Sequence, residues 1–536
     1  MGVGAQAMIL NSDAECAVVL VPLAMALVGS LLWDSTVALL ILVVIAYCYG
    51  TSTFDYFKKK GIPYVKPLPF VGNFGGVITG RYTINDATKL LYDEVKKHRV
   101  GGVFQSRSPA IMVCDPELVK LVLTKDFASL HDHGTPMDEE NDPLSVNLFN
   151  LPGARWKNMR AKLSPLFTSG KLKQFLPLMR EVSIQLNAAL RESAEKGQDV
   201  ELKEILTRFS TDVIGTCAFG VECNSIKDPE SIFYKQSQAF FQSNFLLLLR
   251  FSILSHSKIF AKLVPFKKLL PNMHEFFIHL MEGTIRYRKT NNVVRNDFVQ
   301  MLMQLQENSE GRLGESNPDE VIFTDAVIAA QAFFFFVAGL DAIASSVGFA
   351  LHHLCLDPRI QEDLADEIHS VARQHEGEIT YQGLKEMKLL HMVVSETLRM
   401  YPPGGLIFRE VTAPTYTFPE TDFTVEKGSK VLIPIFGLHN DPDIFPEPSK
   451  FDPYRFTEEA ISKRHPYAYL PFGEGPRVCI ANRFALLEIR LSLAALIKDY
   501  KFSVCPKTQI PLKMKTHTLS LTPQKGFYFK IEKRTL

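Results

Sequence analysis

The chain has 536 residues, of which 46% are hydrophobic and 22% charged, a composition typical of globular proteins with a large core. The formal net charge of +1 excludes the strong positive field that favours nucleic acid, and we expect no nucleic-acid partner. The eight cysteines are widely spaced and form no CxxC pair. This usage argues against a disulfide framework or a structural zinc site and favours a reducing compartment.

The amino-terminal region is apolar in two runs, 16–33 and 35–50, which Asp34 separates. Each run is slightly short for a bilayer span, and three lysines follow at 58–60. We interpret 1–57 as an extension and membrane anchor, spanning at roughly 36–50, with the lysines on the cytoplasmic side. Two spans with a turn at Asp34 are an alternative, and Met25 is an alternative natural start.

The next segment, 58–73, contains Pro63, Pro67 and Pro69 and predicts a stiff, basic and proline-rich hinge, with a plain linker as the alternative. Helical periodicity then dominates from about residue 84 to 400. Short strand-like runs lie near residue 105 and beyond 410. The pattern predicts a mainly α fold with small β-sheets, with a polar surface loop at 307–320.

A single cysteine in the stretch AYLPFGEGPRVCIANRF, residues 468–484, is the clearest chemical feature. Glycines and a proline before Cys479 predict a tight turn with backbone N–H groups aimed at the sulfur. The helix expected after the turn favours a thiolate, and Arg477 is placed to act as its counter-ion. The residue chemistry leaves a nucleophile, a redox sensor and a metal ligand open, although no general base lies in the loop.

The spacing of Phe472, Gly475, Arg477 and Cys479 resembles the haem-binding loop of the cytochrome P-450 superfamily. The resemblance implies the cytochrome P-450 fold and a haem b cofactor whose iron takes the Cys479 thiolate as axial ligand, with Phe472 packed over the sulfur. One departure is Ala481, where the family usually has glycine. We expect the extra methyl group to be tolerated.

A second motif is the ExxR pair Glu396 and Arg399, which share one helix face at this spacing. Alone, such a pair is common on protein surfaces. The resemblance adds Arg455 of FDPYRF as a third member. A buried Glu–Arg–Arg set would hold the core helix against the loop that precedes Cys479.

Four side chains are expected at the haem propionates. Trp156 and Arg160 in WKNMR match the family's WxxxR helix, and both side chains donate hydrogen bonds suited to a carboxylate. Arg409 lies ten residues after Arg399 and, with Arg477, completes the expected set. Taken singly, each arginine is also consistent with a surface charge.

The stretch AGLDA at 338–342 resembles the family's oxygen-binding signature. Ala338 and Gly339 are expected to leave room for dioxygen, and Asp341 to feed protons. The usual threonine is replaced by Ala342, so the hydroxyl that orients protons onto oxygen is missing. We therefore expect poor coupling of reducing power to product.

The resemblance covers roughly 60–530 and is greatest to microsomal insect enzymes that oxidise foreign compounds. It implies a monooxygenase that inserts one atom of O2 into a small lipophilic substrate, using NADPH through cytochrome P-450 reductase, with cytochrome b5 as a further partner. The implied location is the endoplasmic reticulum membrane, with the catalytic domain facing the cytosol. Since the motifs converge on one cofactor, we expect a single catalytic domain over 74–536.

Four residues are candidates for the substrate pocket: Phe335, Ala338, Leu406 and Ile407. The rest of the run 333–336 and the segments around 131–140 and 517–521 are further candidates. The apolar stretch 239–260 is either a membrane-dipping segment or a core helix.

The alanine at 342 keeps two other functions open. One is a haem-thiolate isomerase or dehydratase that acts on oxygenated lipids without a reductase. The other is an inactive haem-binding protein that captures ligands.

Overall fold

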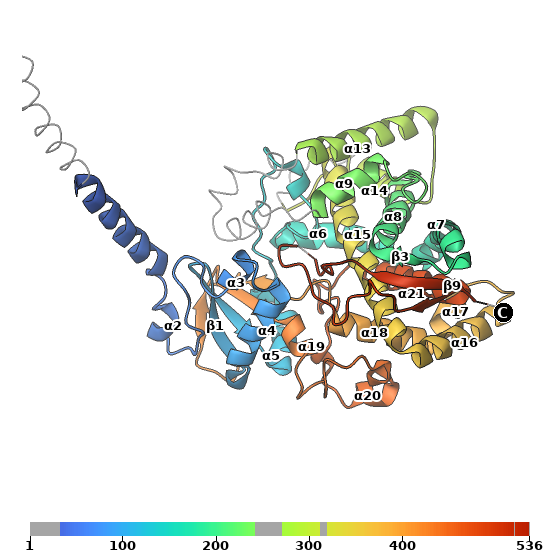
Figure 1. The fold of residues 1–536 in the computed structure, drawn as a ribbon. Coiled ribbons are helices and arrows are strands. Elements are labelled where there is room, and N and C mark those ends of the chain that lie inside the picture. The colour runs from blue at the N-terminus through green and yellow to red at the C-terminus, as the bar shows by residue number, and fades with distance from the viewer. Residues whose placement is uncertain (1–32, 242–270, 311–318, 519, 535–536) are drawn as a thin grey trace, which may run out of the picture.

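The computed structural model describes residues 33–241, 271–310, 319–518 and 520–534. These residues form a mainly helical body with three small sheets, from which a single apolar helix projects (Figure 1). The prediction of a mainly α fold with small sheets is confirmed. The stretch 242–260 of the expected membrane-dipping segment, and most of the loop at 307–320, lie outside the described residues.

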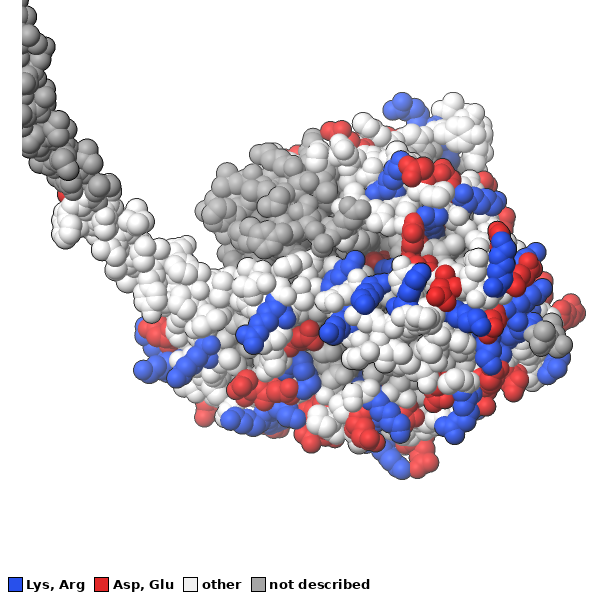
Figure 2. Space-filling view, viewed as in Figure 1, with Lys and Arg blue, Asp and Glu red and all other residues white. Residues whose placement is uncertain are grey.

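The projecting helix spans Trp33–Thr51 and is exposed along nearly its whole length. Its mean hydropathy of 1.7 and its 19 residues suit a bilayer span. Figure 2 shows it as a rod almost without charged side chains, beside a body where both signs of charge are interspersed, and Asp34 is its one charged residue. Asp34 is helical, while Met25 and the apolar run before Trp33 lie outside the described residues.

The segment after this helix packs against the first sheet. Phe57 of α2 (Tyr56–Lys59) is fully buried, and its ring centroid lies 5.0 Å from that of Phe104. A side chain at Gly102 would meet the Phe57 ring at 2.5 Å, so only glycine allows this contact. The backbone N–H of Val65 donates to Gly102 O at 3.0 Å. The predicted hinge at 58–73 is therefore seated on the catalytic body over part of its length.

A four-stranded sheet with the order β1-β2-β7-β4 forms the lobe nearest the projecting helix (Figure 1). Strands β2 and β7 are parallel, and the other two pairings are antiparallel. The remaining sheets have the orders β3-β9-β8 and β5-β6. The strands are β1 (Val100–Gln105), β2 (Ser108–Val113), β3 (Asp199–Glu201), β4 (Ile407–Glu410), β5 (Thr415–Thr417), β6 (Thr424–Glu426), β7 (Lys430–Ile433), β8 (Tyr500–Ser503) and β9 (Tyr528–Lys533).

The larger lobe is built around α15, which packs against α8, α13, α18 and α21. Thr324 caps α15 by accepting a hydrogen bond from Val327 N, and most of the following side chains are buried. The long helices are α4 (Ile84–Val95), α6 (Gly153–Leu163), α7 (Ser169–Glu195), α8 (Leu202–Ile214), α9 (Ile232–Phe241), α13 (Pro271–Asn291), α14 (Phe298–Glu310), α15 (Asp325–Leu356), α16 (Pro358–Gln374), α18 (Lys388–Met400) and α21 (Asn482–Asp499).

Short helices and turns connect these elements. They are α3 (Gly75–Ile78), α5 (Pro116–Lys120), α17 (Tyr381–Glu386), α19 (Ile435–His439), α20 (Glu458–Ser462), η1 (Lys96–His98), η2 (Leu121–Lys125), η3 (Phe127–Ser129), η4 (Pro143–Ser145), η5 (Ser164–Phe167), η6 (Gly215–Phe219), η7 (Pro453–Phe456) and η8 (Pro466–Ala468). Long helices dominate the described part of the region 84–400, as the periodicity of the sequence predicted.

Glu488 is a buried acid in the helical core. It lies in the middle of α21 with no exposed surface, and neither carboxyl oxygen has a hydrogen-bond partner among the described residues. Burial raises the pKa of the Glu488 carboxyl well above its usual value, and the nearby Ser210 hydroxyl of α8 offsets this only in part. Burial therefore favours the protonated carboxyl, because ionising it here would leave an unpaired buried charge.

Replacing Glu488 by glutamine should stabilise the protein at neutral pH, and the gain should increase as the pH rises. The unfolded chain releases this proton above pH 4.5, whereas the folded protein retains it. Wild-type stability therefore falls by about 1.4 kcal/mol per pH unit until the folded pKa is passed, and the glutamine variant lacks this loss. Tm values of both proteins between about pH 5 and 8 measure the difference, and a pH-independent difference would contradict the raised pKa.

Candidate active site

The cysteine loop is closed by a tight backbone turn before α21. Cys479 N donates to Phe472 O at 2.9 Å, which folds the loop back on itself. Gly475 has φ of 76°, and a Cβ there would lie 1.9 Å from Leu123 O, so the position requires glycine. Ala481 has φ of −94°, a conformation open to any residue. The backbone there accepts the extra methyl group, as the sequence predicted.

The Cys479 sulfur is accessible yet desolvated. Its side chain is exposed, but burial raises the pKa of the Cys479 thiol above its usual value. These two facts agree if the sulfur faces a space enclosed by protein. The backbone N–H of Ala481 and the charge of Arg160 favour the thiolate but do not overcome desolvation. The expectation of a low pKa from the helix terminus alone is therefore wrong, and a bound metal ion would be needed to hold the thiolate.

One face of α15 is uncovered in the middle of the fold. Ala338 is exposed and Ala342 is half-exposed. Leu340, which lies between them, and Ile343, which follows, are both buried. Residues four apart share a helix face, so both alanines border the same space. Gly339 does not: a Cβ there would meet Ile214 of α8 at 2.5 Å. Its small size serves helix packing, which corrects the expectation that it makes room for dioxygen.

Asp341 is a paired, buried carboxylate. Lys203 of α8 donates to its Oδ1 at 2.5 Å, and Ser520 of the carboxy-terminal loop donates to its Oδ2. The Lys203 ammonium also donates to Ser345 Oγ at 2.6 Å. Asp341 is therefore held between α8 and the chain end, at the side of the face that carries the two alanines.

Arg409 is the clearest unpaired charge of the site. It is 2% exposed, its Nε has no partner among the described residues, and its one hydrogen bond goes to Phe408 O at 2.7 Å. Desolvation lowers the pKa of Arg409 to about 10. A buried guanidinium without a carboxylate is costly, so this position is suited to receive an anion.

Arg160 and Trp156 lie one turn apart on α6. Burial lowers the pKa of Arg160, and the Cys479 thiolate acts in the opposite direction, which places this guanidinium near the sulfur. No ion pair joins Arg160 to a carboxylate within the described part of the chain. Trp156 is buried, with the Arg477 guanidinium 4.1 Å from its ring centroid.

Arg477 acts as a clamp on a neighbouring loop. It donates to His131 O and Leu151 O, both at 2.9 Å, to Phe149 O at 3.3 Å and to Asp132 Oδ1 at 3.3 Å. The charge that acts on Cys479 is that of Arg160. The prediction of Arg477 as counter-ion of the sulfur is therefore wrong, and few of its donors remain for a propionate.

His133 belongs to the same loop, which the sequence analysis includes among the candidates for the pocket. Burial lowers the pKa of His133 to about 3, and the charges of Arg409 and Arg477 lower it further. Its Nδ1 lies 2.9 Å from Phe149 O, and its ring stacks on Phe149 with centroids 4.2 Å apart. Phe149 in turn stacks on Phe334 of α15. No sequence motif marks His133, because its place depends on how the loop packs.

The predicted pocket residues divide into two groups. Phe335 packs against Phe298 of α14 and Phe167 of η5, with centroid distances of 4.7 and 5.5 Å. Phe334 is the neighbour that reaches the loop with His133. Leu406 and Ile407 are half-buried just before and in β4, and Ile407 lies beside Gly473 of the cysteine loop.

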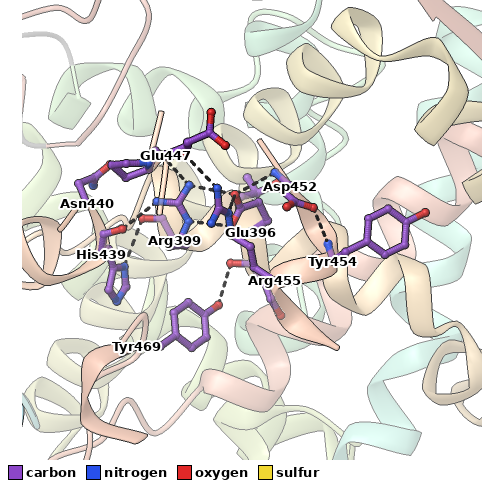
Figure 3. A network of polar contacts seen from close by, with 12 residues as sticks. Glu396, Arg399, His439, Asn440, Glu447, Asp452, Tyr454, Arg455 and Tyr469 are labelled. Atoms are coloured by element: carbon purple, nitrogen blue, oxygen red, sulfur yellow. Dashed lines mark hydrogen bonds and ion pairs between the residues drawn. The ribbon is translucent and has the colours of Figure 1, made fainter. Parts of the chain in front are cut away.

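Glu396, Arg399 and Arg455 meet in a buried network (Figure 3). Arg399 Nε donates to Glu396 Oε2 at 2.7 Å, and Arg455 Nε lies 3.5 Å from Glu396 Oε1. Arg399 also donates to His439 O and Pro448 O, each at 2.7 Å. The structure thus brings all three predicted residues together and ties α18 to the segment that runs toward Cys479.

These features together fit an iron porphyrin. An accessible sulfur in a desolvated setting offers a metal ligand, the alanine face of α15 offers an apolar wall, and buried Arg409 with Arg160 offers partners for carboxylates. The donor set therefore matches the apolar plane and acidic edge of haem.

Comparison with known proteins also indicates a haem protein. The cytochrome P450 family model matches residues 62–531. Cytochrome P450 9e2 of Blattella germanica is 38% identical over 94% of this chain and 98% of its own length. Probable cytochrome P450 6a14 and cytochrome P450 6a2 of Drosophila melanogaster are 37% and 36% identical, over 93% and 91% of this chain and 99% and 97% of their own lengths. The chain belongs to the cytochrome P450 family, whose cofactor is haem, and it is an oxidoreductase of the monooxygenase type.

Proposed function

We propose that this chain is a membrane-anchored monooxygenase that acts on small lipophilic compounds, either foreign compounds or endogenous lipids and hormones. Its electrons come from NADPH through a cytochrome P450 reductase, with cytochrome b5 as a further donor. The observation that most supports this function is an accessible, desolvated Cys479 sulfur in the same site as the buried and carboxylate-free Arg409. Haem held through Cys479 supplies oxygen activation and insertion of one oxygen atom into the substrate.

The chain's own residues would bind the haem and orient the substrate. Arg409 and Arg160 would neutralise the two propionates, and Phe472, whose backbone oxygen accepts from Cys479 N, would shield the sulfur. Ala338 and Ala342 would leave room for oxygen and substrate. Asp341, which is paired with Lys203, borders this face and is the candidate for moving protons from solvent.

The helix Trp33–Thr51 and the lysines at 58–60 support an anchor in the endoplasmic reticulum membrane, with the catalytic body on the cytosolic side. An anchor in the membrane also brings the site close to lipophilic substrates.

The spectrum of the carbon monoxide complex tests the proposal. The reduced, haem-loaded protein should show the long-wavelength Soret band of a thiolate-bound iron, and Cys479→Ser should abolish that band. Cys505→Ser, at another free cysteine, is the matched control and should keep it. Persistence of the band in Cys479→Ser would refute the assignment of the ligand. Product formation from a lipophilic substrate panel with reductase, NADPH and O2 then tests the reaction.

Arg409→Leu should have opposite effects on the empty and the loaded protein. The empty protein loses a desolvated charge and should be no less stable than the wild type. The loaded protein loses a charge-assisted hydrogen bond worth roughly 1.5–3 kcal/mol, so haem should transfer to a scavenger protein about 10–100 times faster. Stability is measured by denaturant unfolding. Equal destabilisation of both forms would show that Arg409 serves folding alone.

An isomerase or dehydratase acting on oxygenated lipids is the second candidate, because Ala342 offers no hydroxyl for oxygen activation. The nearby Ser346 hydroxyl does not replace it, since this hydroxyl donates a hydrogen bond to Ala342 O at 2.7 Å. Turnover of a lipid hydroperoxide without NADPH and reductase would favour it. Substrate binding with no product in either assay would favour the ligand-capture alternative.

Introducing a hydroxyl by Ala342→Thr should raise the product formed per NADPH consumed, because position 342 borders the same space as Ala338. The ratio is measured with purified reductase. Ala350→Thr, at a fully buried position of the same helix, is the control for altered packing and should give no gain. An unchanged ratio in Ala342→Thr would show that a missing hydroxyl does not limit coupling.

A further inference from the structure

His439 lies fully buried at the end of α19, and its two ring nitrogens bridge two parts of the site. Nε2 lies 2.8 Å from the backbone nitrogen of Leu470, which can only donate. Nε2 is therefore the acceptor, and Nδ1 carries the proton that is donated to Arg399 O at 3.2 Å. The hydrogen bonds thus fix one neutral tautomer.

The bond to Leu470 leads directly to the cysteine loop. Gly473 N donates to Leu470 O at 3.1 Å, and Cys479 N donates to Phe472 O at 2.9 Å. A continuous set of hydrogen bonds and adjoining peptide units therefore joins the carboxyl end of α18 to the residue that bears the sulfur.

Neighbouring contacts keep the imidazole in this position (Figure 3). The Tyr469 ring stacks on it with centroids 5.2 Å apart, and the Tyr469 hydroxyl donates to Ser395 O of α18 at 2.9 Å. Arg399 NH1 donates to His439 O at 2.7 Å, so backbone and side chain of His439 both contact the same arginine. Burial lowers the pKa of His439 to about 3, and the ring stays neutral at any working pH.

We infer that His439 is a positioning residue that couples the Glu396–Arg399 helix to the Cys479 loop and holds the sulfur in place for the iron. The inference rests on the proposed role of Cys479 as haem ligand. No charge is needed at His439: the residue acts through one acceptor for Leu470 N and one donor for Arg399 O.

The test uses substitutions that separate these two bonds. His439→Leu removes both, His439→Gln keeps an acceptor at the far end of the side chain for Leu470 N, and His439→Asn keeps a donor close to Arg399 O. His353→Leu is the matched control, because His353 is also a desolvated histidine with a pKa lowered to about 3. Its Nε2 bonds the Tyr401 hydroxyl at 3.0 Å, and its ring stacks on Phe451.

The readout is the ratio of thiolate-free to thiolate-bound iron in the carbon monoxide complex of the full-length, haem-loaded protein. His439→Leu and His439→Asn should raise this ratio about tenfold or more, since each leaves a buried N–H without an acceptor. His439→Gln should restore most of the thiolate-type band. His353→Leu should lower the Tm without changing the ratio. Amide exchange over 470–479 should accelerate in His439→Leu and His439→Asn but not in the control.

Equal ratios in the His439 and His353 variants, or unchanged ratios in all of them, would overturn the inference while leaving the proposed function intact. Absence of the thiolate-type band in the wild type would overturn the proposed function itself, and the inference with it. Should His439→Leu fail to fold, the contrast between His439→Asn and His439→Gln gives the same decision.

Discussion

The fully buried ion pair between Glu396 and Arg399 is the interaction on which the rest of the site depends. Two charges taken out of water must satisfy each other, and the remaining donors of Arg399 must find acceptors. Those acceptors are carbonyl oxygens of residues 439 and 448, far along the chain. The pair thereby fixes the path of the segment that ends in the cysteine loop, and its value lies in geometry more than in net stability.

Desolvation also determines what each buried ionisable side chain requires from its surroundings. Where partners exist, as for Asp341 with Lys203, an ion pair offsets part of the cost of burying the group. Where partners are missing, burial shifts the pKa against the charged form, as at Cys479, Arg409 and Glu488. Cys479 and Arg409 lie in the site, and their complements are a metal ion and a carboxylate. Glu488 lies in the helical core, where burial favours the protonated form of its carboxyl.

Much of this could be predicted from residue patterns, because periodicity marks α15 and α18 and the spacing of Phe472 to Cys479 marks the loop. Patterns could not assign the direction of side chains. Gly339 packs against α8, and Arg477 is occupied by loop carbonyls, since both depend on which elements approach from elsewhere in the fold. The individual roles of His133 and His439 could not be assigned for the same reason: a buried histidine shows no signal until its partners are known.

The clamp formed by Arg477 couples a neighbouring loop to the backbone next to Cys479. The Arg477 guanidinium, two residues from Cys479, donates hydrogen bonds to the carbonyl oxygens of residues 131, 149 and 151. That loop also supplies the aromatic contact between Phe149 and the central helix. A displacement of the loop must either break several hydrogen bonds together or pull on the peptide next to the sulfur. Mechanical load on this loop is thus transmitted to the backbone next to the sulfur.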